Sequence, residues 1–380
     1  MNLYFDNAAT SSPKPQIVLD RIQAALTEFN ANPGRSGHPA ALAAAREVLT
    51  CREALAALLG CEDPARIAFA FNCTDALNLA IKGVLRYGDH AIATQLEHNS
   101  VLRPLSALAA RGRISLSIVP PRPDGFVSPD DIRAAIRKNT RLIAVTHASN
   151  VTGAIQPVAA IGQMARREGV CYLIDGAQAL GALPVSVRAL GCDLYAFPGH
   201  KSLLGPMGTG GLYIRPGLSL RPLREGGTGT DSESVLQPES LPEKYESGTL
   251  NLPGIAGLGA GCAFVKERVS AIMAHERELT QAVYEGLSAI PGAEIYSPRE
   301  EAARAGIVSF NLEGMTSSDV SDRLANAGIA VRGGLHCAPG AHRFLNTLRR
   351  GAVRASVGYA NTFEEVDAFL AAVKRIAKGE

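Results

Sequence analysis

The chain has 380 residues, of which 46% are hydrophobic and 19% are charged, so a substantial core can form and wholesale disorder is excluded. The formal net charge of +2 gives no electrostatic reason to expect a nucleic-acid partner. The N-terminus shows no basic stretch followed by an apolar one, and no apolar run approaches the length of a membrane span. We therefore expect a soluble, cytoplasmic protein with no membrane partner.

Short apolar and β-branched runs alternate with helical patterns from about residue 40 to 215. Strands separated by helices predict an α/β domain with a mostly parallel sheet and helices on both of its faces. Helices are expected to begin at Thr74 and near Ser100. The expected strands are 66–71, 90–95, 114–119, 141–147, 170–175, 193–197 and 209–214.

The second part of the chain has a different organisation. Residues 222–254 are rich in Gly, Pro, Ser, Glu and Thr, which predicts a long connection. A long helical pattern then runs to about residue 288, followed by expected strands at 293–297, 306–312 and 329–332 and a last helix at 362–378. We therefore expect an N-terminal arm (1–15), a large domain (16–254) and a smaller α+β domain (255–380).

Five of the expected strands are followed by polar clusters, which read FNCTD, LEHN, ASN, DGAQ and PGHK. Ligands of such sheets bind at the carboxyl ends of the strands, so these clusters are expected at one edge. Asp175 ends one strand and Lys201 follows another, and this pair suits an enzyme that uses pyridoxal 5'-phosphate (PLP). The lysine would bind the aldehyde as a Schiff base, and the carboxylate would keep the pyridine nitrogen protonated.

Other nucleotide and metal motifs fit poorly. GHKS lacks the glycine that precedes the lysine of a P-loop, and GPMGTGG leads into a strand instead of opening a helix. The seven cysteines form no CxxC pair and are odd in number, which excludes a disulfide framework or a zinc site. His336 beside Cys337 is a poor match to a metal site, and none is expected.

The motifs YFDNAAT, LEHNS, HASNVTG, LIDGAQ, GHKSLLGP, YESGTLN, RGGLHCA and VRASVGY occur in this order along nearly the whole chain. Together they resemble the cysteine desulfurase family of class V, fold-type I PLP enzymes. The resemblance implies that Lys201 forms the Schiff base, that Asp175 pairs with the ring nitrogen, and that His98 stacks on the ring and relays protons. It assigns further contacts to Gln178 and Asn150 at the ring or substrate, Thr74, Cys73 and His200 at the phosphate, Thr249 at the partner subunit's phosphate in a homodimer, and Arg354 at the substrate carboxylate.

Some of these residues also have plain structural interpretations. His98 could cap a helix, Asn150 could serve a turn, and Arg354 could form a surface ion pair. The chain also departs from the family where Pro198 and Gly199 replace a frequent Ser or Thr, and where Cys73 precedes Thr74 in place of a second threonine. Both changes reduce the number of expected phosphate contacts.

Cys337 is the candidate that selects the reaction, because it matches the family's nucleophile. The implied reaction converts L-cysteine to L-alanine and leaves the sulfur on Cys337 as a persulfide. Cys73 is the rival thiol, and the remaining five cysteines (Cys51, Cys61, Cys171, Cys192 and Cys262) are expected to be inert.

Arg354 follows Cys337 by only 17 positions. This spacing resembles the short-loop, group II branch of the family, which implies a dedicated sulfur-acceptor protein. The alternatives left open are a selenocysteine lyase, another class V aminotransferase, which would not need Cys337, and a binding or regulatory protein without activity.

Overall fold

The computed structural model describes residues 3–34 and 36–380; the first two residues of the expected N-terminal arm lie outside the described part. A seven-stranded sheet forms the centre, in the order β2-β8-β7-β6-β5-β3-β4. All of its paired neighbours are parallel except those of β8, which runs antiparallel to β2 and β7. The strands are β2 (Ile67–Ala70), β3 (Asp89–Thr94), β4 (Ile114–Val119), β5 (Thr140–Thr146), β6 (Cys171–Asp175), β7 (Leu194–Pro198) and β8 (Gly210–Ile214).

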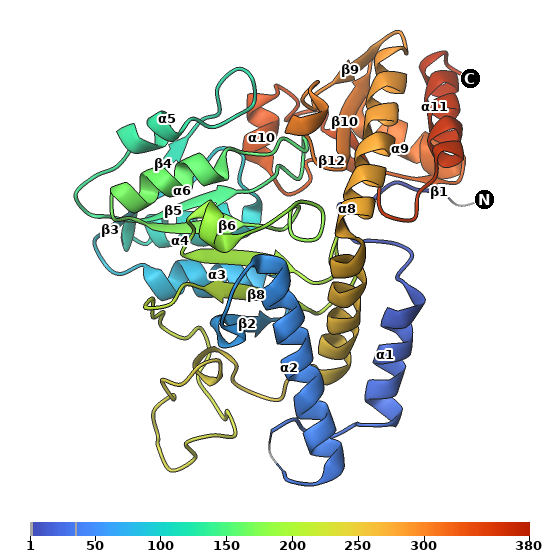
Figure 1. Ribbon diagram of the computed structural model, residues 1–380. Helices are drawn as coiled ribbons and strands as arrows, with labels where there is room; N and C mark the ends of the chain where they lie inside the picture. The colour runs from blue at the N-terminus through green and yellow to red at the C-terminus, as the bar shows by residue number, and fades with distance from the viewer. Residues whose placement is uncertain (1–2, 35) are drawn as a thin grey trace.

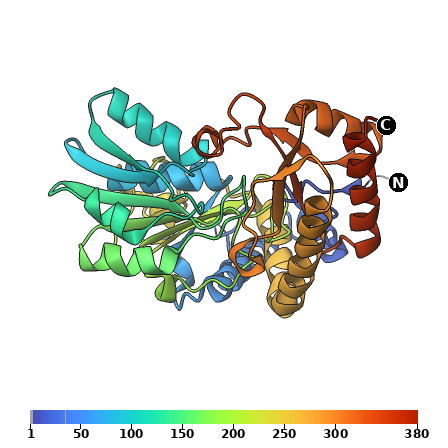
Figure 2. The same cartoon turned by 90° about the horizontal axis from the view of Figure 1, so that it is seen from above.

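Helices cover both faces of this sheet, as Figures 1 and 2 show. Successive strand residues point to opposite faces. In β6, Tyr172 and Ile174 join the core beneath α2 and α8, whereas Leu173 joins the core beneath α3 and α4. The helices before α8 are α1 (Gln16–Thr27), α2 (Pro39–Leu59), α3 (Cys73–Val84), α4 (Asn99–Ala110), α5 (Pro129–Ala134), α6 (Val158–Arg167) and α7 (Val187–Leu190). The predicted α/β class is confirmed.

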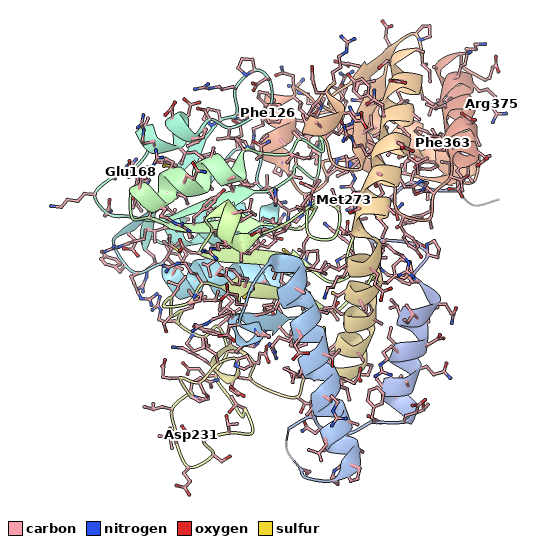
Figure 3. All side chains as sticks on the ribbon, viewed as in Figure 1. Phe126, Glu168, Asp231, Met273, Phe363 and Arg375 are labelled. Carbon is pink, nitrogen blue, oxygen red and sulfur yellow. The ribbon has the colours of Figure 1, made fainter. Side chains whose placement is uncertain are left out.

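The expected long connection runs from β8 to α8 and contains a single 3-10 turn, Glu243–Tyr245, among the residues described there. It extends away from the sheet, and Figure 3 shows Asp231 at its outer end. Helix α8 (Leu252–Ser288) then passes along α1 and α2 and continues to the second sheet (Figure 1).

The second sheet is antiparallel, in the order β12-β13-β10-β9. Its strands are β9 (Ala293–Ile295), β10 (Ile307–Leu312), β12 (Arg332–Gly334) and β13 (Ala352–Ser356), accompanied by α9 (Ser317–Asn326), α10 (Pro339–Phe344) and α11 (Phe363–Ala377). The single strand expected at 329–332 is wrong in detail. It divides into β12 and β11 (Ile329–Ala330), and β11 instead pairs in parallel with β1 (Leu3–Tyr4).

Candidate functional site

A cavity of about 170 Å³ opens at the carboxyl ends of the parallel strands. All five polar clusters of the sequence contribute to its wall, because parallel strands bring their carboxyl ends to the same edge. Two of the seven sheet strands, β6 and β7, deliver Asp175 and Lys201 to it. The lining residues are Asn72, Cys73, Thr74, Leu77, His98, Ser100, Thr146, Ala148, Asn150, Asp175, Ala177, Gln178, Pro198, His200 and Lys201.

Lys201 and Asp175 carry the main charges of this cavity. Burial, and secondarily the positive charge of Arg354, lower the pKa of the Lys201 amine to about 8 against weaker opposing effects of Cys73 and Asp175. Oδ1 of Asp175, which is 3% exposed, accepts a hydrogen bond of 3.0 Å from the backbone N–H of Ala177. The lowered pKa makes the neutral amine, the form that can attack a carbonyl, far more abundant near physiological pH than for an ordinary lysine.

Cys73 also lies against Asp175, with its thiol donating to Oδ1 at 3.5 Å. Burial, and secondarily the negative charge of Asp175, raise the pKa of this thiol well above its ordinary value. Cys73 thus stays protonated even though it is the first residue of α3, where the helix dipole would favour a thiolate.

His98 and Thr74 are linked through Ser100, a residue that the sequence interpretation missed. His98 caps α4, and its Nδ1 accepts a hydrogen bond of 3.0 Å from the Ser100 N–H. The Ser100 hydroxyl lies 2.9 Å from the same nitrogen and 2.7 Å from the Thr74 hydroxyl. Burial lowers the pKa of His98, so the neutral ring carries its proton on Nε2.

His200 offers a free acceptor or donor inside the wall of the cavity. Its Nδ1 is buried and has no hydrogen-bond partner among the described residues. Burial, together with the charges of Lys201 and Lys14, lowers the pKa of His200 to about 4. The preceding Gly199 has a packing reason to be glycine, because a Cβ there would lie 2.1 Å from Oγ1 of Thr209. This contact explains why no serine or threonine occupies that position.

Glu97 was not predicted either. It is completely buried beside His98, and its Oε1 accepts hydrogen bonds from the Thr94 hydroxyl at 2.6 Å and from the Thr146 N–H at 3.0 Å. Its Oε2 has no partner among the described residues. Burial raises the pKa of Glu97 to about 8, so this carboxyl group holds a proton at neutral pH and joins the ends of β3 and β5.

Arg354 lies on β13, behind the cavity wall, and only 2% of it is exposed. Its guanidinium donates to Oδ1 of Asp6 and to the backbone oxygen of Asn150, both at 2.9 Å. Its Nε is buried and has no partner among the described residues. Arg354 is therefore a buried, paired cation and not the surface ion pair of the plain interpretation.

Cys337 is the one exposed thiol of the seven cysteines. Three hydrogen bonds attach its loop to the edge of the seven-stranded sheet: Asn99 N–H to the oxygen of Cys337 (2.7 Å), Asn150 Nδ2 to the oxygen of His336 (2.6 Å) and Gln95 Nε2 to the oxygen of Gly340 (3.1 Å). The thiol loop is therefore docked beside His98, the chain neighbour of Asn99.

Two buried imidazoles hold this loop from the other side. His336 and His342 stack, with 3.3 Å between Nδ1 and Nε2, and the Thr347 hydroxyl lies 2.8 Å from His342 Nδ1. His336 Nε2 lies 3.2 Å from the Arg332 oxygen, so it must be the donor there. Burial lowers the pKa of His336 to about 3 and that of His342 to about 4, so both rings are neutral. His336, which had no assigned role, supports the loop.

One predicted residue, Thr249, lies outside this cavity, and another, Gln178, lines it with its amide already hydrogen-bonded. Thr249 is exposed and lines a separate pocket with Gly208 and Arg224, so it does not reach the Lys201 cavity of its own chain. Gln178 does line the cavity, but its Nε2 donates to the oxygen of Ala8 at 3.0 Å.

Across residues 3–34 and 36–380 there is no cluster of three or more His, Cys, Asp or Glu suited to a metal ion. No helix in the same residues is long and apolar enough to span a membrane.

The fold and cavity together define a fold-type I transferase. The chain belongs to the aminotransferase class-V family, which it matches over residues 3–369. Among its relatives, a probable cysteine desulfurase of Methanothermobacter thermautotrophicus is 38% identical, covering 99% of this chain and 95% of the relative. A cysteine desulfurase of Serratia proteamaculans is 36% identical, covering 99% and 93%.

Solved structures agree with this assignment. The apo cysteine desulfurase of Thermococcus onnurineus superimposes with a TM-score of 0.94 at 33% identity, covering 100% of this chain and 95% of that one. The cysteine desulfurase CsdA of Escherichia coli gives a TM-score of 0.90 at 29% identity, covering 99% and 95%. The resemblance drawn from the sequence motifs is confirmed at the level of the family.

Proposed function

We propose that this protein is a PLP-dependent cysteine desulfurase that converts L-cysteine to L-alanine and keeps the sulfur on Cys337. The observation that carries the proposal is the docked loop, which holds the one exposed thiol beside a cavity containing Lys201 and Asp175. A class V aminotransferase would have no chemical need for such a thiol.

The cavity residues fit PLP. Lys201 supplies an amine with a pKa of about 8, Asp175 a carboxylate for the pyridine nitrogen, and His200 an unpartnered Nδ1. The first turn of α3, with Thr74, supplies backbone N–H groups and a favourable dipole for a phosphate. When bound, PLP acts as an electron sink that stabilises negative charge on the substrate's Cα.

Each remaining group has a task that its environment supports. The neutral Lys201 amine can accept the Cα proton, and the Nε2–H of His98 can donate one. We expect the substrate carboxylate to bind near Asn150, which lines the cavity, and Arg354, which donates to the backbone oxygen of Asn150 and keeps an Nε without a partner among the described residues. Gln178 would serve the ring hydroxyl once its amide turns from Ala8.

The transfer of sulfur to Cys337 requires no external oxidant. The Cys337 thiolate attacks the sulfur of the substrate, an S–S bond forms, and the Cβ–S bond of the substrate breaks. The electron pair of that bond stays on the carbon, which takes up a proton and becomes the methyl group of alanine. Cys337 retains the sulfur as a persulfide, to be removed by a thiol acceptor.

The assembly follows from the same proposal. Thr249 is exposed and remote from its own cavity, which supports a homodimer in which it contacts the partner subunit's phosphate. The docked loop and its short spacing support the group II assignment and an acceptor protein that comes to Cys337. The three-part division at residues 15 and 254 remains our proposal; α8 begins at Leu252, close to the second boundary.

The test is to incubate the PLP-loaded enzyme with L-cysteine and look by mass spectrometry for one added sulfur on Cys337. Cys337→Ala should abolish alanine formation and leave the bound-PLP absorbance intact, while the matched Cys73→Ala keeps the persulfide on Cys337. Unchanged alanine formation by Cys337→Ala would disprove the desulfurase assignment. L-selenocysteine assayed in parallel separates this function from a selenocysteine lyase.

A further inference from the structure

The segment that carries Cys337 has an unusual charge distribution. Across the whole chain, 38 basic residues nearly balance 36 acidic ones. Residues 323–363, however, contain six arginines and no aspartate or glutamate. Arg354 is neutralised by Asp6, and Arg350 pairs with Glu294. The excess positive charge is therefore left on the surface around the thiol.

Four exposed arginines of this segment form no ion pair with any described residue. Arg323 lies in the last turn of α9, and the three that are nearer to Cys337 in the chain are Arg332, Arg343 and Arg349. Arg332 lies on β12, the edge strand of its sheet, and its backbone oxygen binds the ring of His336. Arg343 lies on α10, which begins two residues after Cys337.

The third arginine belongs to the turn that closes back on the thiol loop. Arg349 lies between Thr347, whose hydroxyl is hydrogen-bonded to His342, and Gly351. A Cβ added to Gly351 would lie 2.9 Å from the backbone of Gly334, so the two glycines are closely packed. The neighbouring helix α4 adds the exposed Arg103 and contains no acidic residue. Arg103 and Arg332 both act electrostatically on His98, so these arginines lie close enough to influence a residue that lines the cavity.

Apolar side chains are interspersed with these arginines. Leu335, two residues before Cys337, and Leu348 are each 38% exposed. Arginine next to partly exposed apolar side chains is typical of surfaces that bind another protein, whereas lysine and small polar residues dominate the rest of a protein surface. The chemistry of a partner for this surface is therefore apolar at its centre and acidic around it.

We infer that this surface (Arg332, Leu335, Arg343, Leu348 and Arg349 around Cys337) binds an acceptor protein that presents a cysteine surrounded by aspartate and glutamate. The inference rests on the proposed function and adds the charge of the partner. In the transfer step, the acceptor thiolate attacks the outer sulfur of the Cys337 persulfide. A new S–S bond forms on the acceptor, the old one breaks, and Cys337 leaves as a thiolate, with no net oxidation.

Charge complementarity of this kind mainly raises the association rate and depends on salt. Acidic neighbours raise the pKa of a thiol and lower its thiolate fraction, so they would slow transfer to a peptide in the absence of a docking surface. The acidic peptide is therefore expected to be the less reactive thiol by itself. If the enzyme transfers sulfur to it faster than to the neutral peptide, the difference must come from binding to the enzyme.

The probes are two synthetic peptides with one central cysteine, the first flanked by four aspartate or glutamate residues and the second by the matching asparagine or glutamine residues. The enzyme is loaded with sulfur by L-cysteine, and the second-order rate of sulfur transfer to each peptide is measured at low and high salt. We expect the acidic peptide to react about tenfold faster at low salt and the difference to disappear at high salt, where the Debye length falls to about 3 Å.

The decisive variant is Arg343→Glu combined with Arg349→Glu, which should remove or invert the preference for the acidic peptide. The matched control, Arg167→Glu with Arg188→Glu, changes the charge equally at exposed positions on α6 and α7 and should keep the preference. Equal rates for both peptides, or an unchanged preference in the first variant, would overturn the inference.

A second assay, alanine formation with dithiothreitol as the sulfur acceptor, distinguishes a failure of this inference from a failure of the proposed function. If both double variants and the parent enzyme form alanine at the same rate, the chemistry is intact and only docking is being compared. If no enzyme forms alanine or a Cys337 persulfide, it is the desulfurase proposal that has failed.

Discussion

Replacing Gly340 with alanine should displace the thiol loop without disturbing the cavity. Gly340 is buried, and a Cβ on it would lie 2.1 Å from the backbone oxygen of Gln95, whereas real Cβ atoms essentially never come within 3.0 Å of such an atom. The loop must therefore move away from the β3–α4 turn by about 0.9 Å or more. Because Gly340 is three residues from Cys337 and bound to Gln95 itself, this movement should reach the thiol.

A misplacement of about 1 Å can lower the rate of a reaction by about 100-fold, so we expect kcat/KM for alanine formation to fall by about 10- to 100-fold. Gly340 lies inside α10, where alanine is favoured over glycine by about 1 kcal/mol, so lost helix propensity would not explain the effect. Bound-PLP absorbance and the thermal unfolding midpoint should stay near those of the parent.

Gly37→Ala is the matched control, because nothing lies within 4 Å of the added Cβ. Alanine formation is measured for both variants under saturating PLP. If Gly340→Ala forms alanine at the rate of the parent, then close docking of the loop on Gln95 is not required for sulfur transfer.

Further predictions concern single groups of the site. The rate of PLP uptake by the apo enzyme, measured by stopped-flow absorbance, should rise with pH and level off above about 8, because only the neutral Lys201 amine attacks an aldehyde. A rate that keeps rising toward the ordinary lysine pKa of 10.5 would contradict this prediction. Asp6→Asn should lower the free energy of unfolding by about 2 kcal/mol, measured by urea denaturation, since it leaves the buried Arg354 without its charged partner, and Asp6→Glu should recover part of the loss. Limited iodoacetamide under native conditions should label Cys337 before any other cysteine, and labelling of Cys73 first would refute the effect of burial on that thiol.

The α/β class, the positions of most strands along the chain and the residues that meet at the carboxyl edge of the sheet could be predicted from the sequence alone. Alternation of strands and helices leaves few topologies, and each parallel strand ends at the same edge, so Asp175 and Lys201 could be placed together from their positions alone. The motifs around them then indicated the family, and Cys337 stood out by its position in RGGLHCA.

The burial of each thiol and the support of the Cys337 loop, by contrast, could be seen only in the folded protein. Cys73 is the first residue of a helix, and that local position favours a reactive thiol; burial, and secondarily contact with Asp175, 102 residues away, raise the pKa of the thiol and reverse the effect. The support of Cys337 likewise comes from Gln95 and Asn150, which are distant in sequence and adjacent through the packing of the two sheets. Desolvation and long-range hydrogen bonds depend on what surrounds a group in space, and no local pattern in the chain encodes them.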